Sequence, residues 1–263
     1  MLKGLYTAYS GMVNEQNRMD VLTNNLANSA TTGYKAEGAT SQTFDAMLAY
    51  RIKDEQDGYA GGVYLGNNNP GVKIGETYTD YSQGSFRETG NTYDLALSGE
   101  GFFTIEYTNR AGETSTMYTR DGSFTLTKEG YLVTKDGDYV LGKGANGEVG
   151  HIKIDPTHAA AIDTEGRVIQ NDQVLATLQI TDFEDYNYLE HYGENFYQPV
   201  EGAEITESSA KVQSGYLEAS NVQVVREMVE LISVTRQYES NQKILQAYDE
   251  TLQISVNQLG KLQ

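Results

Sequence analysis

A seven-residue apolar repeat near the carboxyl terminus constrains the fold of this chain more than any other feature. The repeat comprises Val224, Leu231, Tyr238, Leu245, Leu252 and Leu259. Met228 and Val256 occupy a companion position whose other members are polar. Such spacing aligns side chains along one side of a helix, as in a coiled-coil seam. We therefore predict a C-terminal helix over residues 216–263, a segment without proline that would extend roughly 60 Å at about 1.5 Å per residue.

A second amphipathic stretch opens the chain. Its apolar residues recur at three- and four-residue spacings, and Glu15 interrupts them; they are Leu5, Ala8, Met12, Met19, Leu22 and Leu26. This spacing predicts a helix within residues 1–35. The two terminal helices could simply cover each other as a hairpin, or could do so only in contact with copies or relatives of the chain. We favour the second alternative because a long apolar stripe needs a covering surface.

The centre of the chain changes to alternating apolar and polar residues with glycine turns. Segments such as 94–98, 102–107 and 131–134 have strand composition, and Glu129-Gly130 and Asp136-Gly137 are typical of tight hairpins. We predict an antiparallel all-β domain over residues 82–215, with an irregular return segment from 186 to 215. The fold class is then α+β, with the β domain inserted into a discontinuous helical coiled-coil domain made by both termini.

Residues 36–81 predict an extended connecting segment. Residues 44–50 could form a short helix, whereas 58–71 are rich in glycine and asparagine, which is loop composition. The terminal segments are close to neutral, with net charges of +1 for residues 1–35 and −2 for residues 216–263, so the central segment carries most of the net charge of −18.

This charge argues against nucleic acid or an anionic membrane as a partner, because both attract basic proteins. The chain has no cysteine, which excludes disulfides and a thiol nucleophile. No apolar run reaches the roughly 18 residues that span a bilayer. The first residues lack a secretory signal, which predicts a cytoplasmic protein or one exported without a cleaved signal.

Residues that could support catalysis are scarce. His151, His158 and His191 lack the spacing of metal ligands and are better explained as surface residues. Phosphate-binding loops and nucleophile elbows are absent from the sequence. We therefore predict no catalytic residue, no metal, no cofactor and no small-molecule substrate.

An asparagine-rich motif follows the first helix. Its residues are Asn24, Asn25, Leu26, Ala27, Asn28, Thr32 and Gly33. Helix capping alone could explain it, since asparagine bonds to local backbone and Gly33 can adopt the left-handed conformation that ends a helix.

Together with other segments, this motif resembles the bacterial flagellar rod and hook proteins. The matching blocks are Ser10-Gly11-Met12 with Asn24 to Lys35; Gln83-Gly84-Ser85-Phe86 through Ala96; Gly99-Glu100-Gly101-Phe102-Phe103; Tyr118 to Phe124; and Gln213 to Val222 with Glu227-Met228-Val229 and Arg236 to Glu239. The blocks occur in order across nearly the whole chain, which makes the resemblance specific.

The resemblance implies a structural subunit of the flagellar basal body and no enzymatic activity. The terminal helices would form the inner layer of a helical tubular polymer that transmits motor torque to the hook, and the β domain an outer layer. The implied partners are copies of the chain, neighbouring rod and hook proteins, and the flagellar type III export apparatus, with export that leaves no cleaved signal and no membrane insertion.

Within the family, the long segment 34–81 and Gly193 to Tyr197 resemble the distal rod branch, whereas residues 142–173 are shorter than in many of its members. A proximal rod or hook-type axial protein is the alternative. Two rivals come from other classes, namely a carbohydrate-binding or hydrolytic β domain with incidental coiled-coil ends, and a dimeric coiled-coil adaptor.

Overall fold

The computed structural model divides into two compact units, each built from segments that are distant in sequence. It describes residues 2–44, 47–51, 63–68, 71–109, 112–144, 147–193 and 195–259. The helical unit comprises Met1–Ala27, Glu37–Thr79 and Gln223–Gln263, and the β unit comprises Asn28–Ala36 and Asp80–Val222. This division differs from the four consecutive segments expected from sequence, because residues 37–79 group with the helices and residues 28–36 with the strands.

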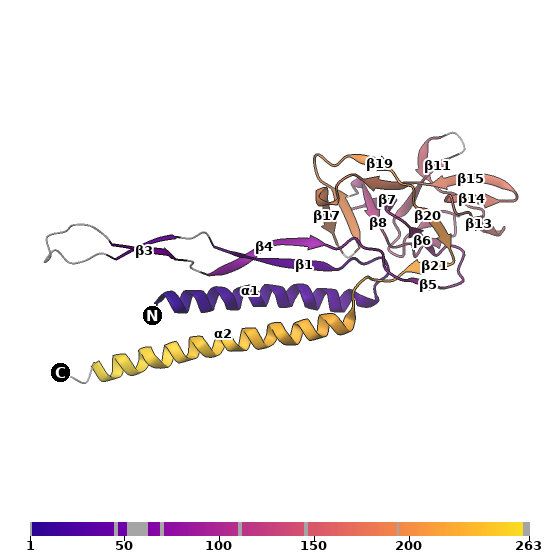
Figure 1. Ribbon diagram of the computed structural model, residues 1–263. Helices are drawn as coiled ribbons and strands as arrows, with labels where there is room; N and C mark the ends of the chain where they lie inside the picture. Colours follow the sequence, from indigo (N-terminus) through magenta and orange to yellow (C-terminus); the bar gives the residue numbers. More distant parts are fainter. Residues whose placement is uncertain are drawn as a thin grey trace. The chain divides into compact units, whose positions relative to one another are not determined.

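Two long helices form the helical unit, as predicted (Figure 1). Helix α1 spans Leu2–Ala27 and helix α2 spans Val224–Leu259. The predicted start of the second helix at Tyr216 is wrong, since residues 216–218 form strand β21 (Tyr216–Glu218). That strand pairs with β5 (Phe86–Glu88) and buries Leu217 and Glu218, so strand pairing outweighs helix propensity there.

The helices pack against each other in antiparallel orientation. A Cβ atom at Gly4 would collide with the Tyr248 ring, and one at Gly11 would lie 3.0 Å from the Asn241 amide nitrogen. The two glycines and their two partners are each seven residues apart. A heptad-spaced pair of small residues therefore lets the helices approach closely along this face.

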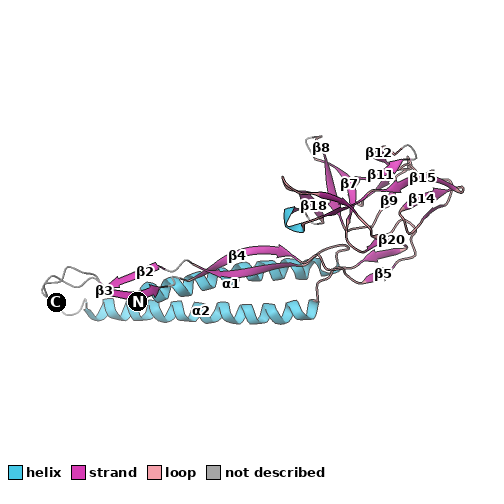
Figure 2. Ribbon diagram, turned by 45° about the horizontal axis from the view of Figure 1, so that its top comes forward, coloured by secondary structure: helices cyan, strands magenta, loops and turns pink. Residues whose placement is uncertain are grey.

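A β-hairpin covers the other side of α1, which lies between the hairpin and α2 in both views (Figures 1 and 2). Strand β1 (Glu37–Thr43) pairs with β4 (Val72–Thr79), and β2 (Met47–Arg51) pairs with β3 (Val63–Asn68). The short helix considered over residues 44–50 is wrong where the structure describes it, because Met47–Arg51 is a strand. Half of the glycine-rich stretch, at residues 58–62 and 69–70, lies outside the described residues, and the loop expected for the rest is wrong at residues 63–68, which form β3.

The β unit is antiparallel throughout its described strands, as predicted. Besides β5 and β21 it contains η1 (Asn28–Ala30), β6 (Leu95–Ser98), β7 (Phe102–Thr108), β8 (Thr114–Thr119), β9 (Thr125–Leu126), β10 (Leu132–Val133), β11 (Tyr139–Gly144), β12 (Val149–His151), β13 (Ala160–Ile162), β14 (Arg167–Gln170), β15 (Gln173–Leu178), β16 (Ile180–Phe183), η3 (Tyr186–Tyr188), β17 (Leu189–Tyr192), β18 (Phe196–Pro199), β19 (Ile205–Glu207) and β20 (Lys211–Ser214). The largest sheet runs in the order β13-β14-β15-β11-β7-β8-β18-β17.

The return segment is more regular than expected. Residues 186–215 include β17 to β20, and β20 pairs with β6. The predicted tight turns are confirmed at Gly130 and Gly137, whose φ angles are 89° and 101°.

Strand β7 organises two cores, one on each of its faces. Phe102 packs with Tyr118, Phe183 and Tyr197, while Phe103 and Ile105 belong to a larger cluster. Alternate side chains of a strand point to opposite faces, so a strand buried on both faces needs consecutive apolar residues. In the described part of the chain, no helix is long and apolar enough to cross a membrane.

Candidate assembly interface

The predicted seam of α2 is divided between two faces of the helix. Leu231, Tyr238 and Leu245 are half-buried, in line with packing against α1. The companion residues Met228 and Val256 are instead exposed, with 48% and 71% of their surface accessible. The side chain of Leu259 lies outside the described side chains.

The second set of α2 residues that faces α1 lies three positions after each residue of the repeat. The sequence predicted the set that lies four positions after it. The set that faces α1 consists of Glu227, Val234, Asn241, Tyr248 and Ser255. Val234 is buried, and Tyr248 and Asn241 lie against the two glycines of α1. The sequence pointed to the other position because Met228 and Val256 are more apolar than Glu227 and Ser255.

The predicted seam of α1 lies in the interior of the helical unit. Ala8 and Leu22 are buried, and Leu5, Met12, Met19 and Leu26 are half-buried. Glu15 is accommodated through Arg18, whose guanidinium lies 3.3 Å from Glu15 and 3.0 Å from Glu230 of α2. An ion pair thus replaces apolar packing at this level of the helix pair.

Both helices also carry apolar residues that the chain itself leaves exposed. On α2, Val225, Met228, Val229 and Ile232 are 77%, 48%, 64% and 52% exposed. We call these four residues the α2 ridge. A contiguous exposed apolar patch on a folded protein marks an interaction surface more often than an isolated apolar residue does.

The asparagine-rich motif is shared between the two units. In the helical unit, the buried Asn25 side chain donates to the Glu37 carbonyl at 2.7 Å and accepts from the Glu37 amide at 2.9 Å. It also donates to Glu227 of α2 at 3.3 Å. Asn24 and Ala27 are exposed at the end of α1, with Leu26 half-buried. The motif therefore joins three segments, beyond the capping of one helix.

The second half of the motif lies in the β unit. Asn28 begins η1 and accepts at its carbonyl from the Thr31 amide at 3.2 Å. Gly33 is left-handed as predicted, with φ at 71°, and its amide donates to the Glu218 carbonyl at 2.8 Å. A Cβ atom there would collide with the backbone of residues 120 and 121, so glycine is required both for the turn and for the close approach.

A buried ion cluster lies next to this turn. The Lys35 ammonium donates to Glu218 at 2.7 Å and to the Ser82 carbonyl at 2.8 Å. Arg120 lies 3.4 Å from the other carboxylate oxygen of Glu218, and donates to the Gly99 carbonyl at 2.9 Å. All three charged side chains are at most 4% exposed. Burial lowers the pKa of Lys35, and the Glu218 carboxylate opposes that shift.

The sequence reasoning missed this cluster as a functional feature. Its residues nevertheless come from separate family blocks: Lys35 closes the first, Gly99 begins another, and Arg120 and Glu218 lie within two more. The occurrence of charged residues within these blocks was the available signal. The blocks are thus brought together in space by one set of hydrogen bonds.

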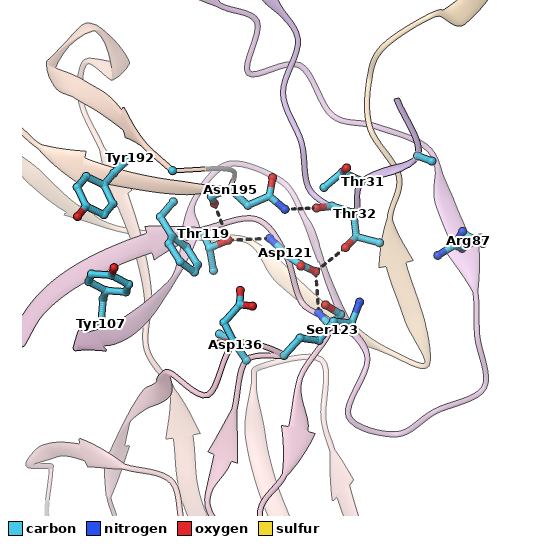
Figure 3. A pocket seen from close by; sticks show the side chains of 15 residues that line it. Thr31, Thr32, Arg87, Tyr107, Thr119, Asp121, Ser123, Asp136, Tyr192 and Asn195 are labelled. Atoms are coloured by element: carbon cyan, nitrogen blue, oxygen red, sulfur yellow. Dashed lines mark hydrogen bonds between the residues drawn. The ribbon is translucent and has the colours of Figure 1, made fainter. Parts of the chain in front are cut away.

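A polar cleft of about 550 Å³ opens beside the motif in the β unit (Figure 3). The Thr32 hydroxyl donates to Asp121 at 2.7 Å, and the Asn195 amide donates to the Thr32 carbonyl at 2.7 Å. Asp121 also accepts from the Ser123 amide at 2.9 Å. Polar groups of the cleft bind one another, and in doing so fasten residues 31–32 to the β strands.

The family model for the flagella basal body rod protein matches residues 5–35, that for the flagellar hook protein FlgE/F/G D1 domain matches 96–170, and that for the flagellar basal body rod FlgEFG protein C-terminal region matches 213–259. The flagellar basal-body rod protein FlgG of Bacillus subtilis is 35% identical, with 98% of this chain and 99% of that protein aligned. The chain belongs to the flagellar basal-body rod protein family.

Two further relatives extend the comparison. The rod protein FlgF of Caulobacter vibrioides is 33% identical, and the hook-basal body complex protein FlhO of B. subtilis is 29% identical, each over the full length of both chains. As a member of this family, the chain is a structural subunit of the flagellar basal body and not an enzyme. Among the residues that the structure describes, no group of three His, Cys, Asp or Glu side chains could hold a metal ion.

Proposed function

We propose that this chain is a distal-rod subunit that assembles through its helical unit into a helical tube that transmits motor torque to the hook. Copies of itself and neighbouring rod and hook proteins are its partners. It reaches the growing rod through the flagellar type III export apparatus, without a cleaved signal.

The exposed α2 ridge carries this proposal. The antiparallel helix pair already satisfies the inner face of α2 within one chain, yet the ridge stays open to solvent. Family membership supplies the kind of partner that covers such a surface. A coiled-coil-like contact between helices of neighbouring subunits fits the seven-residue repeat of α2.

The distal position is supported by the FlgG relative, whose identity of 35% extends over nearly the whole chain. The FlgF branch is a second candidate, because the FlgF relative is 33% identical and aligns over the full length of both chains. The short region noted at residues 142–173 is a departure from the distal rod branch.

Electron microscopy of purified basal bodies that contain the tagged chain tests both parts of the proposal. We expect the tag along the rod, and its level on the rod separates a distal from a proximal subunit. Absence of the chain from basal bodies of motile cells would refute a rod subunit of either kind.

A substitution on the ridge tests the assembly surface. Met228→Asp should leave the free energy of unfolding of the free subunit within about 0.5 kcal/mol, because Met228 is exposed. It should sharply reduce incorporation into rods, because it places a charge in a subunit contact. Glu239→Lys, at an exposed position of the same helix, is the matched control and should incorporate normally.

A further inference from the structure

The last turns of α2 extend beyond the end of α1. Tyr248 lies against Gly4, near the start of α1, and α2 continues from there to Leu259. Figure 1 shows the yellow end of α2 passing the start of α1. Leu252 and Val256 in this extension are 38% and 71% exposed. We call residues 249–259 the α2 overhang.

The overhang continues an established contact surface. Leu252 belongs to the same seven-residue repeat as Leu231, Tyr238 and Leu245, which pack toward α1. Position 252 neighbours positions 249 and 256 on the helix surface, because they are three and four residues away, and Val256 belongs to the exposed companion position. The apolar repeat of α2 therefore continues at Leu252 beyond the helix that covers Leu245 in the same chain.

The helical unit also contains an apolar groove, whose lining is complementary to the apolar residues of the α2 overhang. Its apolar lining consists of Tyr6, Tyr9 and Val13 of α1 with Phe44, Val72 and Ile74 of the hairpin segment, and its volume is about 440 Å³. Tyr6 and Tyr9 are 63% and 54% exposed, and Phe44 is 39% exposed. These side chains form a surface that a helix with apolar residues could cover.

The charges of the two surfaces are opposite. Among the described residues that line the groove, Lys73 alone is charged, and its ammonium lies 6.0 Å from the centre of the Phe44 ring. The overhang contains Asp249 and Glu250 and no basic residue. The carboxyl end of a helix also carries a partial negative charge, which adds to the attraction.

We propose that the α2 overhang of one subunit docks in the Tyr6/Tyr9/Phe44 groove of a second copy, with Asp249 near Lys73. This proposal rests on the proposed rod function and names the contact that joins subunits. The overhang cannot reach the groove of its own chain, because α2 is continuous to Leu259 and packs on the opposite flank of α1 from the hairpin. Two different surfaces make the contact heterologous, and such contacts propagate into helical polymers when they do not close into a ring.

Disulfide cross-linking in cells tests the contact, and the absence of natural cysteines makes it specific. Tyr9→Cys and Val256→Cys are made in separate copies of different tag size and produced together. We expect a Tyr9/Val256 heterodimer in purified basal bodies. The control pairs Val256→Cys with Val149→Cys, which is exposed in the β unit and should yield far less product.

The outcomes separate this proposal from the rod function. Basal bodies that contain both variants but give no heterodimer, or give as much with the control pair, overturn the docking contact and leave the rod function intact. Absence of the wild-type chain from basal bodies overturns the rod function. It also overturns the docking contact, which rests on that function.

A charge-reversal pair gives an independent measurement. Lys73→Glu and Asp249→Lys should each lower subunit incorporation by about fivefold, the effect expected for a lost surface ion pair. The double variant should restore incorporation. The control Lys128→Glu reverses an exposed charge of the β unit and should have no effect. Normal incorporation of both single variants, or loss without recovery in the double variant, contradicts the proposed pairing.

Discussion

At the scale of single residues, Glu218 determines whether the charges inside the β unit are balanced. Its carboxylate accepts from Lys35 and from the Gly84 amide, and lies beside Arg120. A buried ion pair adds little net stability, yet removing one partner leaves an uncompensated charge. The fold of the β unit therefore requires all three charges to be present, although the cluster itself adds little net stability.

Glu218→Ala should lower the free energy of unfolding of the β unit by about 3–5 kcal/mol, because it leaves Lys35 and Arg120 buried without their anion. Urea unfolding of the full chain followed by tyrosine fluorescence measures this. Glu165→Gln removes an exposed partner of Arg167 and should cost less than about 1 kcal/mol. Equal losses from the two variants would disprove the role of burial.

The loss in Glu218→Ala should shrink as pH rises above neutrality toward 10.5, the ordinary pKa of lysine. The folded-state pKa of Lys35 is already below its ordinary value of 10.5, and removing the carboxylate that raises it lowers it further. The unfolded variant then binds more protons than the folded variant, so stability increases with pH in this range. An unchanged deficit across this range would show that Lys35 stays charged.

At the scale of secondary structure, α2 presents two faces with different tasks. One face, through Leu231, Val234 and Leu245, packs toward α1, and the other presents the ridge to solvent. A substitution therefore changes either the stability of the subunit or its assembly, according to the face that it alters.

Leu245→Asp should sharply reduce motility, because Leu245 is half-buried toward α1 and a charge there should cost the packed helix pair about 2 kcal/mol. Swimming assays measure the effect, and Glu239→Lys is the matched surface change. Similar loss of motility in both variants would mean that the helix faces are wrongly assigned.

The sequence predicted both helices because their apolar periodicity is long and regular, and the β unit because its turns are marked by acidic residues followed by glycine. It missed β1, whose sequence from Glu37 to Thr43 is polar and small. Such a strand forms because side chains of α1 bind it, as Asn14 does at Ser41 with a distance of 3.0 Å. Pairing partners that are distant in sequence leave no local periodicity, which is also why the Lys35/Glu218/Arg120 cluster was not predicted.

At the scale of the whole molecule, the two units differ in how much side-chain surface they bury. The β unit contains two clusters of buried apolar and aromatic side chains. Among the described residues of α1 and α2, the buried apolar side chains are Ala8, Leu22 and Val234. Long helices gain most of their stability from such packing, so the helical unit should be the less stable one.

Removing residues 224–263 should abolish incorporation into the rod while leaving the β unit folded. The deleted helix belongs to the helical unit, whereas the β unit ends at Val222. Rod incorporation of the truncated chain and its tyrosine near-ultraviolet circular dichroism check the two halves of this expectation. Normal rods built from the truncated chain would contradict it.

Hydrogen exchange on dilute monomer should separate the units. Amides of Leu5 to Leu26 and Val224 to Leu259 should exchange rapidly, because few buried contacts offset an ordering entropy of about 1–2 kcal/mol per residue. Amides of Phe102 to Val133 should be protected. Strong protection of both helices in a verified monomer would show that the intramolecular hairpin is sufficient to fold them.

The contact between Lys35 and Glu218 spans 183 residues of sequence, and this separation limits when the β unit can finish folding. Closing so large a loop is slow, because the chain loses conformational entropy before the contact between the distant residues stabilises the fold. During synthesis the first of these residues leaves the ribosome long before the second. A newly made chain thus spends most of its synthesis with an incomplete β unit. This leaves time for another protein to bind the chain before it folds.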